Sequence, residues 1–239
     1  LRPGDTVIEA GCGWGAFALH MARHHGVTVK AYNISHEQIA FARERAKRLG
    51  MDHRVQYVED DWRSVNKPCD VFVSIGMLEH VGLNNYRELG GVIERCLKPD
   101  GRALLHTIGQ NWPGKLNPWI ERRIFPGAHP PTLGQITDIL EPYHFSVLDV
   151  ENLRLHYAQT LRHWLERYEQ SIDTVRERFD EPFVRAWRLY LAGSLAAFES
   201  GSLQLFQVLF MREASNHVPR TRAEWYAKPA HIVSEPIHP

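Results

Sequence analysis

The sequence has few cysteines, no excess of charge of one sign and no long apolar run. Each of these absences argues against one class of protein. The three cysteines, Cys12, Cys69 and Cys96, are widely spaced and form no CxxC pair, which argues against a disulfide framework and predicts no bound metal. The 28 basic and 28 acidic residues balance, whereas a nucleic-acid-binding protein shows a basic excess. No apolar stretch approaches the ~20 residues that span a bilayer, and no basic-then-apolar leader directs secretion. We therefore expect a cytoplasmic protein that binds no nucleic acid.

The 239 residues, 44% of them apolar, are enough for one sizeable domain. We assign this domain to residues 1–215. Residues 216–239 hold four prolines and little periodicity, and we interpret them as a poorly ordered tail. The chain starts at Leu1 rather than at a methionine and enters a strand almost at once, so we expect a further N-terminal region in the whole protein.

Short β-branched runs alternate with helical patterns along the chain. The expected strands span 5–10, 27–32, 54–59, 70–76, 102–108, 145–153 and 203–210. The expected helices span about 15–25, 35–50, 86–96 and 132–140, with two long helical stretches at 157–200 that are interrupted near Glu181-Pro182. This alternation predicts an α/β fold: a doubly wound, seven-stranded, mostly parallel sheet with an antiparallel last strand and a helical insertion before it.

Local signals refine the boundaries of these elements. Ser35 with Gln38, and Thr132 with Gln135, have the spacing of helix capping boxes. The KPDG segment at 98–101 is predicted to be a turn, and residues 110–131 an irregular loop. In a doubly wound sheet, ligands bind at the carboxyl ends of the strands. The site is therefore expected in the loops after the first, second, fourth and fifth strands.

The segment EAGCGWG, residues 9–15, follows the first strand and opens the first helix. Glycine there allows either a tight turn or the close approach of a ligand to bare backbone N–H groups, and the pattern alone leaves both open. The spacing is not the G-x-G-x-x-G of dinucleotide-binding proteins, and no GK[ST] follows for a nucleoside triphosphate. Glu9 would lie beneath the ligand as an acceptor, which suits a positively charged group such as the amino group of S-adenosylmethionine.

At these residues the chain resembles the class I S-adenosylmethionine-dependent methyltransferases. More narrowly, it resembles the cyclopropane-fatty-acid synthase and mycolic acid cyclopropane synthase family, from about Leu1 to Arg212. The resemblance is carried by LRPGDTVIEAGCGWG, NISHEQ, VSIGMLEHVG, LKPDG, LLHTIG, PWIERRIFPG and HYAQTLRHW. The first segment is generic to methyltransferases, whereas EHVG together with LLHTIG and IFPG is more specific.

The resemblance implies a set of residues around S-adenosylmethionine. They are Glu9, Gly11, Gly13 and Gly15 at the methionine end, Asn33, Ile34 and Gln38 near the ribose, and Asp61 and Trp62 beside the adenine. Methyltransferases usually have an acid after the second strand, and AYNIS has none, so a polar side chain must serve there. Two residues have alternative roles: Gln38 can complete a capping box with Ser35, and Trp62 can be an ordinary core residue.

The resemblance also implies an unusual reaction. An alkene attacks the sulfonium methyl group, and the resulting cation must lose a proton to close a ring, which requires a base and a water-poor pocket. In the family this base is a bound bicarbonate, which implies catalytic and bicarbonate-binding roles for Glu79, His106 and Tyr157, with the backbone of Ile108 alongside. Alternatively, Glu79 is a helix N-terminal acid and His106 a satisfied core histidine.

Two further segments could either contact lipid or have a purely structural role. Residues 111–127 interleave three aromatic residues with Lys115, Arg122 and Arg123, which suits either a membrane interface or a solvated loop. In the insertion, aromatic and leucine side chains recur at helical spacing, and they are Phe183, Trp187, Tyr190, Leu191 and Phe198. Such a stripe is ordinarily core, and the resemblance implies that it also lines an acyl-chain channel. The family's cysteine-bearing aromatic segment ahead of the first strand has no counterpart in Cys12, Cys69 or Cys96.

Together these features predict transfer of a methylene group from S-adenosylmethionine to the double bond of an unsaturated phospholipid acyl chain. The expected partners are that lipid and, peripherally, the membrane surface, with a homodimer as one option for the assembly. One rival adds a methyl group to a lipid or small amine without ring closure. The other is a catalytically silent domain that binds the cofactor.

Overall fold

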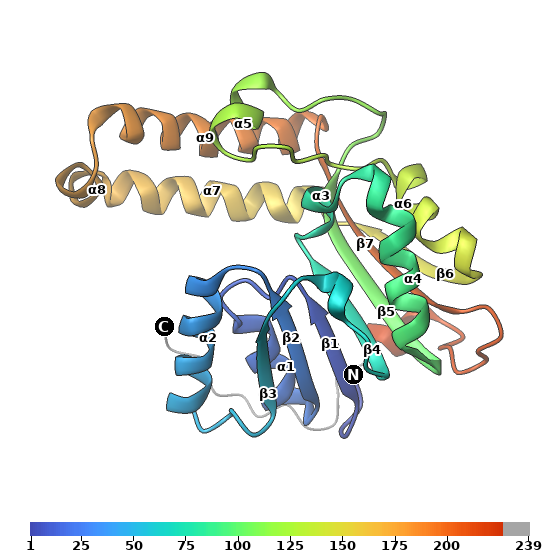
Figure 1. The fold of residues 1–239 in the computed structure, drawn as a ribbon. Coiled ribbons are helices and arrows are strands. Elements are labelled where there is room, and N and C mark those ends of the chain that lie inside the picture. Colours follow the sequence, from blue (N-terminus) through green and yellow to red (C-terminus); the bar gives the residue numbers. More distant parts are fainter. Residues whose placement is uncertain (227–239) are drawn as a thin grey trace.

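Seven strands form one sheet in the order β3-β2-β1-β4-β5-β7-β6 in the computed structural model, which describes residues 1–226 (Figure 1). The strands are β1 (Thr6–Ala10), β2 (Thr28–Asn33), β3 (Val55–Glu59), β4 (Cys69–Ile75), β5 (Leu97–Gly109), β6 (Phe145–Asn152) and β7 (Gln204–Arg212). The strands from β3 to β5 pair in parallel, and β7 is antiparallel to both β5 and β6. The predicted fold class, a mostly parallel sheet with an antiparallel last strand, is confirmed.

Helices cover both faces of this sheet (Figure 1). They are α1 (Ala16–His25), α2 (His36–Arg48), α3 (Leu78–Val81), α4 (Tyr86–Cys96), α5 (Pro118–Arg123), α6 (Leu133–Leu140), α7 (Arg154–Gln170), α8 (Ile172–Arg178), α9 (Glu181–Ser200) and α10 (Arg222–Tyr226). Figure 1 shows α7 and α9 as a pair that reaches across the carboxyl ends of β1, β2 and β3. No helix within residues 1–226 is long and apolar enough to cross a membrane.

The central strands are buried on both faces, which explains their nearly continuous apolar sequences. On β1, Val7 belongs to the core beneath α1 and α2, whereas Ile8 belongs to the core beneath α4 and α6. On β4, Val71 and Phe72 divide in the same way. A third core lies between α7 and α9 and reaches the sheet at Leu205, so the insertion has an apolar interior of its own.

Several boundaries differ from the sequence prediction, each for a local reason. The KPDG segment lies inside β5 as an irregularity: Cys69 pairs with Leu97 and Val71 with Arg102, so the turn residues bulge out of a strand that has already begun. The supposedly irregular loop contains α5, because Asn117 accepts a hydrogen bond from Trp119 N at 2.9 Å.

The insertion has three helices rather than two. Pro182 lies in the first turn of α9 instead of interrupting a helix, because Asp180 caps that helix by accepting from Phe183 N at 2.9 Å and proline is tolerated in a first turn. The insertion also begins earlier than predicted, at Arg154.

The predicted tail contains a short helix, α10, within residues 216–226. Arg222 pairs with Asp149, and the Tyr226 hydroxyl donates to Glu151 Oε1 at 3.3 Å, so contacts with β6 hold α10 against the sheet. Local periodicity could not reveal a helix that depends on these contacts. Residues 227–239 of the predicted tail lie outside the described residues.

One ionic cluster joins three strands at the end of the sheet opposite to the site. Asp70 accepts hydrogen bonds from Thr6 N at 2.9 Å, Thr6 Oγ1 at 2.7 Å and Lys98 Nζ at 2.8 Å. Burial alone would raise the pKa of Asp70, but these hydrogen bonds outweigh it and lower the pKa to about 2. The ionised carboxylate therefore stabilises the fold above about pH 4, and this contribution is lost as the pH falls through 2.

We expect Asp70→Asn to lower the free energy of unfolding at pH 7 by about 1–2 kcal/mol, because one charged partner of a partly buried cluster is lost. Urea unfolding between pH 2 and 7 would measure this effect, with Asp173→Asn at an exposed carboxylate as the control. A variant whose stability falls as steeply below pH 4 as that of the wild type would show that Asp70 is not responsible.

Candidate active site

The glycine turn between β1 and α1 adopts a left-handed backbone at all three glycines, with φ of 83° at Gly11, 51° at Gly13 and 79° at Gly15. A Cβ on Gly11 would lie 2.8 Å from Met77 Cβ, and one on Gly15 would lie 2.6 Å from the Tyr57 hydroxyl. A Cβ on Gly13 would meet no atom within 4 Å. Gly11 and Gly15 are thus required by packing as well as by φ, whereas Gly13 faces open space that a ligand can fill.

Glu9 ends in a buried carboxylate beneath this turn. Its side chain is 2% exposed, and Oε2 has no hydrogen-bond partner among the described residues. Burial raises its pKa to about 8. A buried acceptor without a donor is costly, and an ammonium group above the turn would supply the missing donors. The open Gly13 and the unsatisfied Glu9 together fit the methionine end of S-adenosylmethionine.

Asn33 connects the glycine turn to α2. Its Nδ2 donates to Gly13 O at 3.3 Å and to Gln38 Oε1 at 2.6 Å. The expected capping box is therefore only half formed: Ser35 Oγ accepts from Gln38 N at 3.4 Å, but the Gln38 side chain binds Asn33 instead of reaching back to Ser35. Ile34 is 73% exposed at the same edge. The structure thus brings Asn33 and Gln38 together, and their proposed contact with a ribose stays a prediction.

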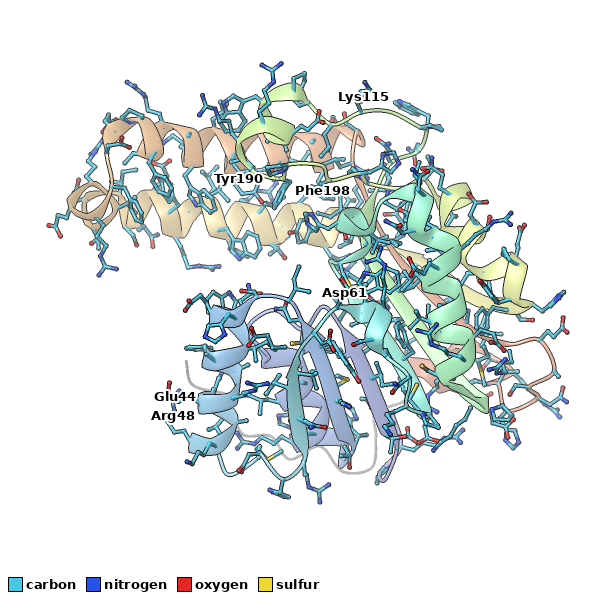
Figure 2. All side chains as sticks on the ribbon, viewed as in Figure 1. Glu44, Arg48, Asp61, Lys115, Tyr190 and Phe198 are labelled. Atoms are coloured by element: carbon cyan, nitrogen blue, oxygen red, sulfur yellow. The ribbon has the colours of Figure 1, made fainter. Side chains whose placement is uncertain are left out.

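Asp61 and Trp62 follow β3 and have clear structural roles. Asp61, which is labelled in Figure 2, caps a short 3₁₀ turn by accepting from Arg63 N at 2.9 Å. Trp62 is buried in the core beneath α4, with the Arg63 guanidinium 4.2 Å from the centre of its ring. Trp62 is therefore a core residue, as the alternative interpretation expected. Contact of Asp61 or Trp62 with an adenine stays a prediction.

Glu79 lies in α3, directly after β4, and its carboxylate is buried with 6% of the residue exposed. Oε1 accepts a hydrogen bond from Ile108 N on β5 at 2.6 Å, whereas Oε2 has no partner among residues 1–226. The backbone carbonyl of Glu79 accepts from His129 N at 2.7 Å, which ties the loop after α5 to the site. Burial raises the pKa of Glu79. Because Ile108 N–H is engaged by Glu79, the structure assigns that backbone group to orienting the carboxylate.

His106 on β5 lies across the sheet from Gln207 on β7, and its Nδ1 is 3.3 Å from Gln207 Oε1. Burial lowers the pKa of His106, with the Gln207 hydrogen bond acting in the opposite direction, so the ring is neutral at pH 7. Which of the two groups donates depends on the tautomer of the ring and on the orientation of the Gln207 amide. The expected role of His106 as a donor to an anion corresponds to the neutral tautomer with its proton on Nε2, in which Nδ1 accepts from the Gln207 amide.

Tyr157, in the first turns of α7, belongs to the aromatic layer between α7 and α9. Its ring contacts Phe198 with centroids 4.8 Å apart and Trp164 with centroids 6.0 Å apart. Burial, with smaller effects of Tyr190 and the Glu79 carboxylate, raises the pKa of Tyr157 to about 12. The hydroxyl therefore stays protonated and can donate a hydrogen bond throughout the physiological pH range.

Two neighbours of this site were not identified as such from the sequence. Tyr190, which is labelled in Figure 2, was expected only as part of an aromatic stripe, but it packs against the same core as Tyr157 and contacts Phe125 with ring centroids 5.8 Å apart. Gln207 was not singled out at all. Its relation to His106 depends on the register between β5 and β7, for which no local motif exists.

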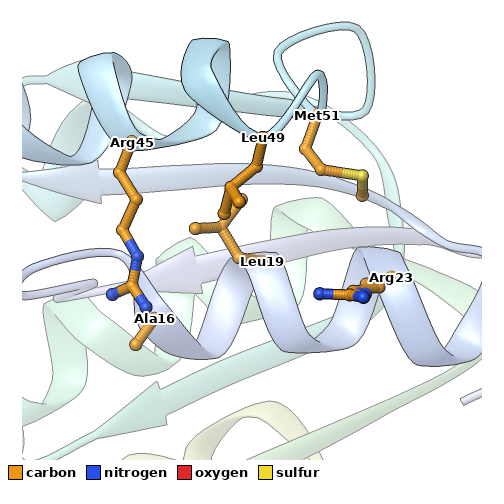
Figure 3. Close-up of a pocket in the computed structure, with 6 residues that line it drawn as sticks. All are labelled: Ala16, Leu19, Arg23, Arg45, Leu49 and Met51. Carbon is orange, nitrogen blue, oxygen red and sulfur yellow. The ribbon is translucent and has the colours of Figure 1, made fainter. Parts of the chain in front are cut away.

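A pocket of about 290 Å³ opens elsewhere, between α1 and α2 (Figure 3). Its lining residues are Ala16, Leu19, Arg23, Arg45, Leu49 and Met51. None of the residues predicted for the site lines this pocket. The described part of the chain also contains no group of three His, Cys, Asp or Glu side chains placed to hold a metal ion. We therefore place the candidate active site at the strand ends, between the glycine turn, Glu79 and Tyr157.

Comparison with known proteins identifies the family of this chain. The model of the family described as mycolic acid cyclopropane synthetase matches residues 1–208. The chain belongs to the mycolic acid cyclopropane synthetase family. The family resemblance predicted from the sequence is thus confirmed, and the class I methyltransferase fold with it.

Two curated relatives and one solved structure illustrate the activities for which proteins similar to this chain are named. Cyclopropane-fatty-acyl-phospholipid synthase of Escherichia coli K12 is 39% identical over 217 residues, which cover 90% of this chain and 56% of that protein. Tuberculostearic acid methyltransferase UfaA1 of Mycobacterium tuberculosis is 35% identical and covers 89% of this chain and 51% of its own length. The crystal structure of mycolic acid cyclopropane synthase CmaA1 with SAH and CTAB has a TM-score of 0.82 at 26% identity, covering 89% of this chain and 79% of that one. The chain spans about half the length of the curated relatives it matches.

The open position at Gly13 gives a direct test of the cofactor site. We expect Gly13→Asn to weaken S-adenosylmethionine binding at least ~10-fold while the unfolding temperature changes little, because asparagine tolerates a left-handed φ but its side chain occupies the ligand's space. Isothermal titration calorimetry would measure the affinity. Gly50→Asn is the matched control, since Gly50 has a φ of 65° and also faces open space. Equal affinity of the two variants would contradict the cradle.

Proposed function

We propose that this chain transfers a one-carbon unit from S-adenosylmethionine to the double bond of an unsaturated phospholipid acyl chain and closes a cyclopropane ring. The observation that carries the proposal is the placement of Glu79: a buried carboxylate with one unsatisfied oxygen, held by the N–H of Ile108, a residue that packs against the same core as Tyr157. A carbocation needs such surroundings, since water would capture it before it lost a proton. Membership of the mycolic acid cyclopropane synthetase family supports the same reaction.

The residues proposed to hold S-adenosylmethionine form one edge of the site. Glu9 would accept hydrogen bonds from the amino group, and Gly13 would leave room for the methionine end. Asn33 and Gln38, already paired with each other, would bind the ribose in place of the missing acid, with Ile34, Asp61 and Trp62 beside the nucleoside. When bound, the cofactor supplies an electrophilic methyl group. Alignment of that group with the alkene is the main contribution of this edge to the rate.

The residues proposed to hold bicarbonate are Glu79, His106 and Tyr157. The atoms present fit this ion: Glu79 Oε2 is an acceptor without a donor, and the Tyr157 hydroxyl is a donor held in place by Phe198 and Trp164. When bound, bicarbonate supplies the base for the reaction. Ile108 N–H fixes Glu79, and a carboxylate that accepts a proton in a hydrogen bond makes its partner more basic. The aromatic layer excludes water from the same volume.

We further propose that residues 111–127 contact a membrane surface, as expected of a peripheral protein on the cytoplasmic side. Trp112 is 66% exposed, and Lys115, which is labelled in Figure 2, is exposed in the same segment, as are Arg122 and Arg123. An exposed tryptophan beside three cations suits the interface of an anionic bilayer.

A second product is favoured by one comparison, because the relative named tuberculostearic acid methyltransferase UfaA1 is 35% identical. In that outcome the lipid gains a methyl branch and no ring. Mass spectrometry of lipids from cells that express the whole protein would test both, with a gain of one CH₂ per unsaturated chain as the expected result. Proton NMR then distinguishes a cyclopropane ring from a branch. Cofactor binding with unchanged lipids would overturn the proposal in favour of a silent domain.

A further inference from the structure

Tyr86, at the start of α4, carries a buried hydroxyl that has no partner among the described residues. The residue is 1% exposed. Other tyrosine hydroxyls donate to backbone carbonyls: Tyr57 to Gly15 at 2.6 Å, Tyr143 to Arg87 at 2.8 Å and Tyr168 to Val184 at 2.8 Å. Because an unpaired buried hydroxyl is destabilising, a phenylalanine would be the better residue at position 86 unless the hydroxyl has a function.

Another buried unsatisfied atom, Glu79 Oε2, belongs to the short helix α3 that precedes Tyr86 in the chain. In the chain, only the end of α3 and a 3₁₀ turn separate the two residues. A hydrogen bond from Asn85 Nδ2 to Val81 O at 2.6 Å stabilises this turn. Leu78, Val81 and Tyr86 belong to one core cluster beneath α4 and α6. After burial, the group with the largest effect on the pKa of Tyr86 is the Glu79 carboxylate, which raises it. Tyr86 and the short helix that carries Glu79 thus share one buried core.

We propose that Tyr86 is a positioning residue for Glu79: its hydroxyl donates to one buried water molecule, which in turn donates to Glu79 Oε2. A buried water ordinarily makes about three hydrogen bonds to polar groups that would otherwise be unsatisfied, and the Tyr86 hydroxyl and Glu79 Oε2 are two such groups. Ile108 N–H on Oε1 and the Tyr86 bridge on Oε2 would then fix the carboxylate from both sides. A carboxylate has lone pairs left for a ligand on the Tyr157 side. The catalytic consequence rests on the proposed function, whereas the bridge itself does not.

Tyr86→Phe removes the hydroxyl and leaves the ring. We expect turnover to fall about 10-fold, the effect of one hydrogen bond to a charged group, with the KM for S-adenosylmethionine unchanged. The acidic limb of the pH profile should move to higher pH, because loss of a donor to the ionised carboxylate raises its pKa. The other titratable groups around the pair, Tyr157 on α7, Tyr190 on α9 and Asp138 on α6, are unchanged in this variant.

Tyr143→Phe is the matched control, because Tyr143 packs against the same helix at Gly90 and Gly91 but its hydroxyl binds Arg87 O. This control should lose some thermal stability and keep the wild-type pH profile. Wild-type turnover and an unmoved pH profile in Tyr86→Phe would overturn the proposal. No conversion of unsaturated phospholipid vesicles by the wild type would instead count against the proposed function.

A thermal double-mutant cycle tests the bridge without any substrate. Tyr86→Phe should lower the unfolding temperature of the wild type by about 2–4 °C. In a Glu79→Met background it should cause no loss, because the hydroxyl then has no carboxylate to reach. Equal shifts in the two backgrounds would show that Tyr86 and Glu79 are independent, and the proposal would be wrong whatever the activity of the chain.

Discussion

Glu79→Gln is expected to lower the alkene-modifying turnover of the whole protein by ~10²–10⁴-fold, the range for a misplaced general base. Glutamine keeps the shape of the side chain, and its Oε1 can still accept from Ile108 N–H, so the backbone arrangement at 2.6 Å should persist. The change removes the negative charge and places an N–H donor where an acceptor is needed. Turnover with labelled S-adenosylmethionine and unsaturated vesicles, with and without added bicarbonate, would measure the effect.

Two controls separate catalysis from folding and binding in this experiment. Calorimetry should give the same S-adenosylmethionine affinity for Glu79→Gln and wild type, since Glu79 is not among the residues proposed to hold S-adenosylmethionine. Glu44→Gln changes an exposed glutamate on α2 and should leave turnover intact. If Glu79→Gln forms product at the wild-type rate with the same bicarbonate dependence, Glu79 is only a structural acid at a helix start.

The sheet could be predicted from the sequence because its signals are local. The β-branched runs at β1, β2 and β4 are buried on both faces, and the glycines before α1 require a left-handed backbone that the structure shows. The expected capping box at Thr132 and Gln135 is confirmed for the same reason: both halves of it lie within four residues. The box at Ser35 was half wrong, because Asn33 competes for the Gln38 side chain.

Relations across the fold could not be predicted in this way. The resemblance gave Glu79, His106 and Tyr157 as one group, but nothing in the sequence showed that Ile108 N–H binds Glu79 or that Gln207 faces His106. Both contacts depend on strand register, and β7 comes after the three helices of the insertion. Tyr190 could not be predicted as a neighbour of Tyr157 for a similar reason. The two residues are far apart in the sequence and come together only when α9 packs on α7.

Glu9 is expected to make the cofactor-free protein less stable as the pH rises. Its pKa is raised from 4.5 to about 8, so the folded state retains a proton that the unfolded state releases. Between these two pH values the unfolded state therefore binds fewer protons, and the free energy of unfolding falls by roughly 4–5 kcal/mol. Buried His106 acts in the opposite direction, because its lowered pKa favours the fold as the pH rises. The difference between wild type and Glu9→Gln isolates the contribution of Glu9.

Glu9→Gln should thus stabilise the cofactor-free protein at pH 8 and weaken its hold on an ammonium-bearing ligand. An ammonium group above the carboxylate favours its ionised form, so binding of S-adenosylhomocysteine at pH 7 should release about one proton from wild type and none from the variant. Calorimetric titrations in buffers of different ionisation enthalpy measure this number directly. Glu44→Gln, at an exposed position on α2 (Figure 2), is the control and should behave as wild type. Binding heats that are independent of buffer for both proteins would show that Glu9 does not meet the ammonium group, and the methionine end would then have to lie elsewhere.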